Sequence, residues 1–107
     1  MFSAIVFQKK EFGAYLGEAP LTVDLNKYES VAMLDKRDLS HAKILEEAFE
    51  LTNSIDAYWG ENEGVEVLGG GRYRSTSVGD VIWLESDDGV GDGMYIVDNF
   101  GFKRVNR

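Results

Sequence analysis

The residue types that most often carry catalysis or bind transition metals are almost missing from this chain. It contains a single histidine, His41, and no cysteine. A serine or threonine nucleophile needs a base beside it, and His41 has no sequence signature around it. A transition-metal site would have to rest on carboxylates alone, which is rare. The sequence therefore predicts a protein that is not an enzyme, with no catalytic residue, no metal site and no cofactor.

Two glycine-rich segments are candidates for ligand-binding loops. Residues 87–93 place three aspartates among glycines, but they lack the alternating acids and distant glutamate of an EF-hand. Residues 69–71 are three glycines, and Arg72 follows them instead of the lysine and hydroxyl residue of a phosphate-binding loop. We expect the first segment to be a hairpin tip without tight calcium binding, and the second to be a turn.

Polar residues with a tryptophan follow the helix expected near residue 50. Asn53, Asp56 and Asn62 are costly to bury without partners, which Arg72 or Arg74 could provide. Such a network would be a structural lock or a recognition site, and Trp59 would either close the core or anchor a partner. Both alternatives stay open at this point. The candidate interaction residues are Asn53, Asp56, Trp59, Glu61, Asn62, Arg74 and Asp80.

One amphipathic helix must position these groups. Apolar residues recur at spacings of three and four from Ile44 to Ile55, which predicts a helix over about 40–55 with Ser40 as its N-cap. We expect the side chains of Ile44, Ala48, Leu51 and Ile55 to pack on a sheet that contains Ile5, Phe7, Val81, Trp83 and Ile96.

The rest of the chain reads as strands and turns. Strands are expected near residues 2–7, 21–25, 30–34, 65–68, 81–84, 94–97 and 102–105, with charged residues 35–38 ending the third. Glycine-rich residues 86–93 should join an antiparallel hairpin. In the string 75–80, hydroxyls and the Asp80 carboxylate should bind local amides before the next strand begins. The sequence predicts a single α+β domain over 1–107, with a mostly antiparallel sheet and one principal helix.

Charge and composition exclude some partners. Nineteen acidic residues against eleven basic ones give a net charge of −8, which repels phosphate backbones and anionic lipid. The apolar run at residues 2–7 is too short to span a membrane, and its lysines come after it, unlike those of a signal peptide. We expect no direct nucleic-acid or membrane binding, and a reducing, cytoplasmic location. The sequence leaves the oligomeric state open.

Two segments resemble known families. Residues 50–56 with 59–62, and residues 74–82 with 95–102, resemble a family of small uncharacterised proteins encoded by tailed phages. The second half resembles the YodL-like domain of phages and mobile elements. The resemblance covers about half the chain and implies a phage protein in the cytoplasm of a host cell, but it implies no chemistry.

Three function classes follow. The first is a non-enzymatic phage-type protein that binds a host protein and redirects or inhibits it. The second is a nucleic-acid mimic that blocks a host nuclease or polymerase, although bases interspersed among the acids argue against a phosphate-like face. The third is a small-ligand or enzymatic module that uses Asn53, Asp56, Asn62 and Arg74.

Overall fold

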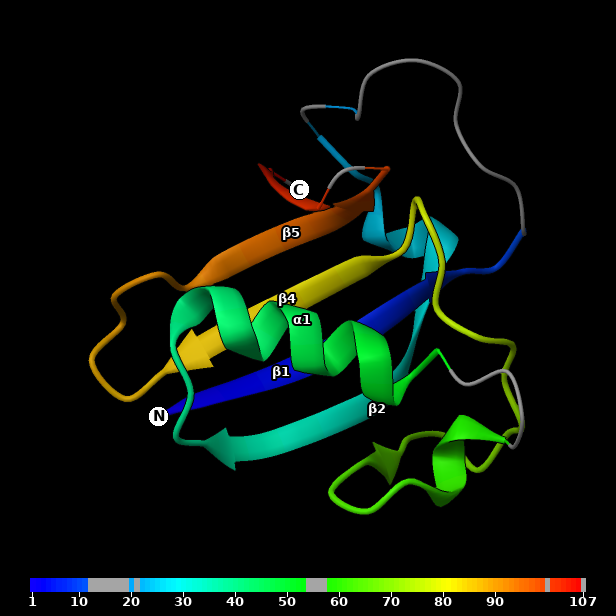
Figure 1. The fold of residues 1–107 in the computed structure, drawn as a ribbon. Helices are drawn as coiled ribbons and strands as arrows, with labels where there is room; N and C mark the ends of the chain where they lie inside the picture. Colours follow the sequence, from blue (N-terminus) through cyan, green and yellow to red (C-terminus); the bar gives the residue numbers. More distant parts are fainter. Residues whose placement is uncertain (12–19, 21, 54–57, 100, 107) are drawn as a thin grey trace.

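The computed structural model describes residues 1–11, 20, 22–53, 58–99 and 101–106. Six strands form one sheet in the order β3-β2-β1-β4-β5-β6, and each neighbouring pair is antiparallel (Figure 1). The predicted α+β class is confirmed. The strands are β1 (Phe2–Lys9), β2 (Tyr28–Arg37), β3 (Glu66–Val67), β4 (Val81–Ser86), β5 (Gly93–Asp98) and β6 (Gly101–Val105). The helices are η1 (Leu25–Lys27), α1 (His41–Leu51) and η2 (Trp59–Glu61).

Helix α1 starts at its predicted cap. The Ser40 hydroxyl accepts a hydrogen bond from the Lys43 amide, and Ile44, Leu45 and Ala48 are buried against the sheet. The helix ends at Leu51, earlier than the predicted 55, and the Thr52 hydroxyl donates to the Ala48 carbonyl at 2.7 Å. Ile55 lies outside the described residues.

Helix α1 packs on the face of the sheet opposite to the one that we expected. Successive residues of a strand point to opposite faces, so an error of one residue exchanges the side chains on the two faces. Ile5, Phe7 and Trp83 are expected on the helix side and lie on the other face. The core beneath α1 instead contains the alternate residues Ala4, Val6, Ile82, Leu84, Tyr95 and Val97, while Val81 and Ile96 belong to a separate cluster on the far face.

Two predicted strands near the start of the chain also differ. Strand β2 continues through the charged residues that were expected to end it, because Lys36, at φ 43°, lies where the β1–β2 register shifts. In the segment expected to form a strand at 21–25, Thr22 makes one isolated bridge to Asn106 and Leu25 begins η1. Leu21 lies outside the described residues.

The strands of the C-terminal half agree with expectation. The loop at 87–92 joins β4 and β5 in the predicted antiparallel hairpin, and β6 pairs with β5. Gly69 and Gly70 adopt φ values of 72° and 70°, the left-handed conformation of a glycine turn.

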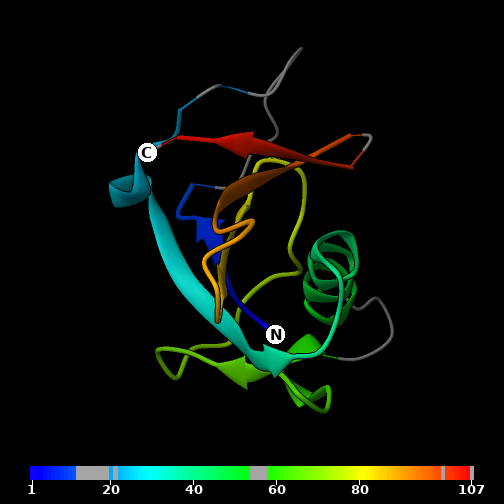
Figure 2. The same ribbon diagram turned by 90° about the vertical axis from the view of Figure 1, so that its left-hand side faces the viewer.

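The two faces of the sheet are covered differently. Figure 2 shows α1 on one side, whereas the short η1 segment lies at one end of the other side. Val23 and Leu25 pack there against Val81, Met94 and Ile96. In the described part of the chain, no helix is long and apolar enough to cross a membrane.

Candidate functional site

Two of the candidate residues, Asp80 and Trp59, contact Arg74, which lies in the long connection before β4. Its guanidinium forms a two-pronged ion pair with Asp80, with Nη1–Oδ2 and Nη2–Oδ1 distances of 2.7 and 2.8 Å. Its carbonyl oxygen accepts hydrogen bonds from Gln8 Nε2 at 2.8 Å and from the Trp59 indole at 2.7 Å. Arg74 therefore joins β1, η2 and the entry to β4.

The Asp80 side chain is buried, at 1% exposure, and accepts hydrogen bonds from several donors. Besides Arg74, the backbone amides of Lys9 and Ser77 donate to it at 3.0 and 2.8 Å. Gly79, at φ 98°, makes the turn that brings this carboxylate under the sheet, as the string 75–80 predicted. A buried carboxylate with an arginine and two amides satisfies its charge locally. The arrangement is that of a structural lock.

Tyr28 lies against this lock from β2. Its hydroxyl donates to the Gly79 carbonyl at 2.8 Å. Burial, with the negative charge of Asp80 as a smaller cause, raises the pKa of Tyr28 to about 12. The hydroxyl stays protonated at neutral pH and acts as a donor.

The side-chain amides of Asn53 and Asn62 donate to backbone carbonyl groups. Asn53 Nδ2 donates to the Thr76 carbonyl at 2.6 Å, and Asn62 Nδ2 donates to the Leu51 carbonyl at 2.8 Å. Trp59 is 1% exposed and belongs to the core. These contacts favour the structural alternative for Asn53, Trp59 and Asn62. Glu61 is exposed, and Asp56 lies outside the described residues.

His41, at the first position of α1, packs against the β4–β5 hairpin. Its Nε2 lies 2.7 Å from the Tyr95 hydroxyl, which also donates to the Gly91 carbonyl at 3.0 Å. The contact holds the helix start to the hairpin loop. No group of three or more metal-ligating side chains gathers within the described ranges.

A different surface stands out on the sheet face away from α1. Ile5 lies opposite Met33 on β2 and opposite Trp83 on β4, so the three side chains form a row across neighbouring strands. All three are half-buried, and so is Phe7, which lies two residues further along β1. Strand alternation puts these apolar residues on one face. The sequence did not predict this surface, because Ile5, Phe7 and Trp83 were expected to pack beneath the helix.

Exposed carboxylates border this row, which we call the sheet-face row (Ile5, Phe7, Met33 and Trp83). Glu66 pairs with Met33 across β3 and β2. The Trp83 indole donates to Glu85 Oε1 at 3.1 Å, and Asp35 accepts from the Ser3 hydroxyl at 3.0 Å. Asp35 and Glu85 thus border the row on its Ser3 side, and Glu66 lies at its β3 end.

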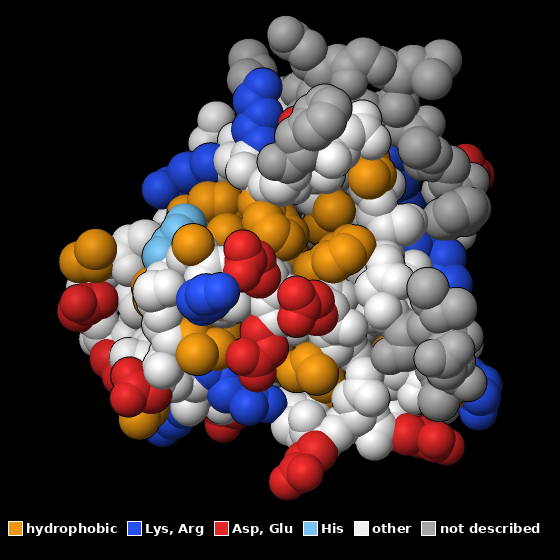
Figure 3. All heavy atoms as spheres, viewed as in Figure 1, with side chains coloured by type: hydrophobic (Ala, Val, Ile, Leu, Met, Phe, Trp, Pro, Cys, Tyr) orange, Lys and Arg blue, Asp and Glu red, His pale blue; other side chains and the backbone are white. Residues whose placement is uncertain are grey.

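The helix side carries its own apolar strip. Figure 3 shows hydrophobic side chains gathered beside the charged outer surface of α1, toward β5. Phe49 and Phe102 meet edge to face there, with ring centroids 6.3 Å apart. This strip is the natural comparison for any test of the sheet-face row.

Comparison of the chain with protein-family models, curated proteins and solved structures finds no match.

Proposed function

We propose that this protein is a non-enzymatic, phage-type binding protein that acts in the host cytoplasm by docking on a host protein. The single observation that supports it best is the sheet-face row, in which four large apolar side chains are only half-buried. Trp83 lies beside Ile5 at the β4 end of the row, and tryptophan is among the residue types that most often dominate the energy of interfaces. The phage resemblance of residues 74–82 and 95–102 supports the host as the source of the partner.

The charges around the row define the chemistry of the partner. Glu66, Glu85 and Asp35 are all exposed on this face. The whole chain carries a charge of −8. A complementary surface presents lysine or arginine around an apolar centre, which speeds encounter and sets orientation. The occupant is therefore a host protein with a basic rim, and a second acidic copy of this chain is disfavoured.

Capture from a host lysate tests the proposal. The parent chain serves as bait beside a Trp83→Ala variant, and beside Phe102→Ala as a matched aromatic truncation on the helix side. We expect the parent and Phe102→Ala to capture one protein with a basic surface. Trp83→Ala should lose it although this variant still unfolds in a cooperative transition, at a lower temperature because Trp83 also packs on the far-face cluster. Specific loss on Phe102→Ala, or no capture by the parent, contradicts it.

Two further outcomes separate this proposal from its rivals. A Glu61→Ala bait tests the predicted footprint beside the helix end, and loss of capture there with retention on Trp83→Ala would move the site to that end of the molecule. A captured nuclease or polymerase subunit that is displaced by DNA would support nucleic-acid mimicry instead.

A further inference from the structure

The width of the sheet-face row matches one α-helix. Among the residues that the structure describes, Val23 and Leu25 cover one end of the sheet face away from α1, and the row stays half-buried. From Met33 on β2, through β1, to Trp83 on β4, the row crosses two strand spacings, or about 10 Å. An α-helix with its side chains is about 10–12 Å across, so a single helix can cover the row.

The row suits a helix better than another strand. A strand from a partner would pair with the open backbone groups at an edge of the sheet and not with its face. A sheet face packs on helices or on a second sheet, and four apolar side chains over three strands are few for a second sheet. The other face of this sheet already carries a single helix, since α1 lies over β1 and β4 (Figure 1).

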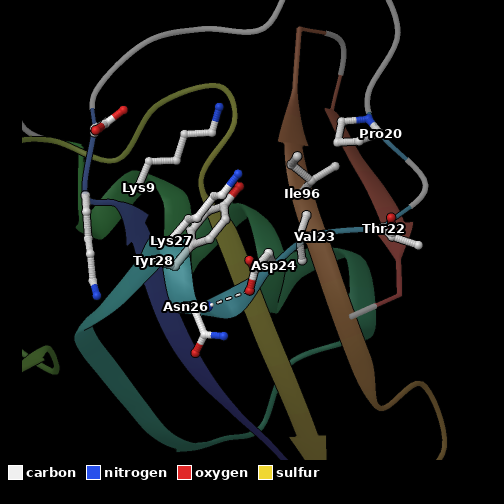
Figure 4. A pocket seen from close by; sticks show the side chains of 11 residues that line it. Lys9, Pro20, Thr22, Val23, Asp24, Asn26, Lys27, Tyr28 and Ile96 are labelled. Atoms are coloured by element: carbon white, nitrogen blue, oxygen red, sulfur yellow. Dashed lines mark hydrogen bonds between the residues drawn. The ribbon is translucent and has the colours of Figure 1, made fainter.

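The charged groups at the two ends of the row have opposite signs. Glu85 lies opposite Ser3, and Asp35 accepts from the Ser3 hydroxyl, so both carboxylates lie at the Ser3 end. Lys9 lies at the other end of β1, opposite Tyr28 of the far-face cluster. Both residues also line a pocket of about 690 Å³ at that end (Figure 4). Negative groups favour the N-terminus of a helix and positive groups its C-terminus, so these charges define one direction for a docked helix.

We propose that the sheet-face row binds one amphipathic helix of the host protein, which lies along β1 with its N-terminus at Ser3 and its C-terminus toward Lys9. The inference rests on the proposed function, because it assigns an element of the partner to the same surface. Apolar side chains of that helix, spaced at i, i+3 or i+4 and i+7, contact the row. The carboxylates at the Ser3 end face the free amides of the first turn of the helix.

Disulfide trapping measures both the direction and the rise of the bound element. The chain has no cysteine, so one cysteine can be introduced at either end of the row. Ser3→Cys marks one end, and Ser30→Cys marks the other because Ser30 lies opposite Phe7. Ser3 and Phe7 are separated along β1 by about 13 Å, at about 3.3 Å per residue. Along a helix that rises about 1.5 Å per residue, the same distance spans about nine residues.

The probe is the protein that the parent chain captures from host lysate, with its own cysteines replaced and single cysteines introduced along the docking segment. A disulfide forms only where the two Cα atoms come within about 7 Å, so each trapped pair marks a contact. We expect the position trapped by Ser30→Cys to lie about nine residues C-terminal to the one trapped by Ser3→Cys. Glu46→Cys, exposed on α1, is the matched control and should trap none.

A charge substitution tests the direction independently. Glu85→Gln keeps an acceptor for the Trp83 indole but removes the negative charge at the Ser3 end. The affinity for the captured protein should fall roughly two- to fivefold, as expected for a charge at a helix terminus. Glu46→Gln, on α1, should bind like the parent, and equal affinity of the Glu85 and Glu46 variants would overturn the assigned direction.

The outcomes separate this inference from the proposed function. Trapped positions about four residues apart would indicate an extended segment, and the reverse order would indicate a helix that runs the other way. Either result overturns the inference and leaves the proposed binding surface in place. Absence of any capture by the parent overturns the proposed function, and the inference with it.

Discussion

Ile5 and Trp83 lie directly opposite each other on β1 and β4, on the face of the sheet that α1 does not cover. With Met33 on the other side of Ile5, they place an apolar row across three strands. The exposed acids Asp35, Glu66 and Glu85 border it. This relationship is the basis of the proposed binding surface.

The ion pair between Arg74 and Asp80 should carry a large share of the stability. Replacing Arg74 by alanine leaves a carboxylate of 1% exposure with two amide donors and no cation. We expect a loss of about 3 to 5 kcal/mol in the free energy of unfolding, measured by urea denaturation.

The exposed pair of Lys43 and Glu46 on α1 provides the control for that experiment. Glu46→Ala should change the free energy of unfolding by less than about 0.5 kcal/mol, because solvent screens this pair. Similar losses in Arg74→Ala and Glu46→Ala would show that the lock around Asp80 contributes little.

Alkaline pH should weaken the fold through Tyr28. Its pKa of about 12 in the folded protein lies above the ordinary tyrosine value of 10.0, so the unfolded chain releases this proton first as pH rises. The contribution of Tyr28 is complete below pH 10 and falls by about 1.4 kcal/mol per pH unit from there to about 12. Denaturation of the parent and of Tyr28→Phe across this window measures it. The Phe variant should be less stable at pH 8 but show a shallower slope, and parallel slopes would argue against the assignment.

Alanine substitutions in the core beneath α1 should lower the free energy of unfolding more when the replaced side chain is more deeply buried. Ile44 is fully buried, and its replacement by alanine should cost roughly 2 to 5 kcal/mol. Leu51 is only half-buried at the helix end, so Leu51→Ala should cost less than Ile44→Ala, at the lower end of that range or below it. Thermal melting compares the two. A larger loss for Leu51→Ala would mean that the helix end is packed more tightly than the structure shows.

The hairpin loop at 87–92 should not bind calcium tightly. The Ser86 hydroxyl lies 3.0 Å from Asp88 Oδ1 and 2.8 Å from Asp92 Oδ1 and can donate to either, and the Val90 amide donates to Asp88. These hydrogen bonds, that of the Val90 amide first, lower the pKa of Asp88. Calorimetric titration should show no submillimolar, calcium-selective signal. Such a signal in the parent, abolished by Asp88→Asn and Asp92→Asn, would contradict this.

The helix and most strands were predictable because their signals are local. The Ser40 cap, the spacing of Ile44 and Ala48, and the β-forming run at 81–84 each act within a few residues. The continuation of β2 was not predictable, because the bulge at Lys36 is stabilised by pairing with β1, a contact distant in sequence.

The face of the sheet that packs on α1 was also beyond local reasoning. Ala4 and Ile5, or Trp83 and Leu84, are all apolar, so alternation alone cannot tell which of each pair meets the helix. The candidate site was predicted only in part. Residue types indicated that Asn53, Trp59 and Asn62 needed partners, but their partners are carbonyl groups of Thr76, Arg74 and Leu51, which a sequence pattern does not reveal.

The most direct test of the proposed binding surface uses the difference between the two tryptophans. Trp59 is buried in the core, whereas Trp83 is half-buried in the sheet-face row. Acrylamide quenching of tryptophan fluorescence reports on Trp83. It is measured with and without the captured host protein, whose own tryptophans are replaced by an analogue that does not fluoresce in this range. The account predicts that the partner protects Trp83 from quenching and that a Trp83→Phe variant shows no such change. Binding that leaves the quenching of Trp83 unaltered would contradict it.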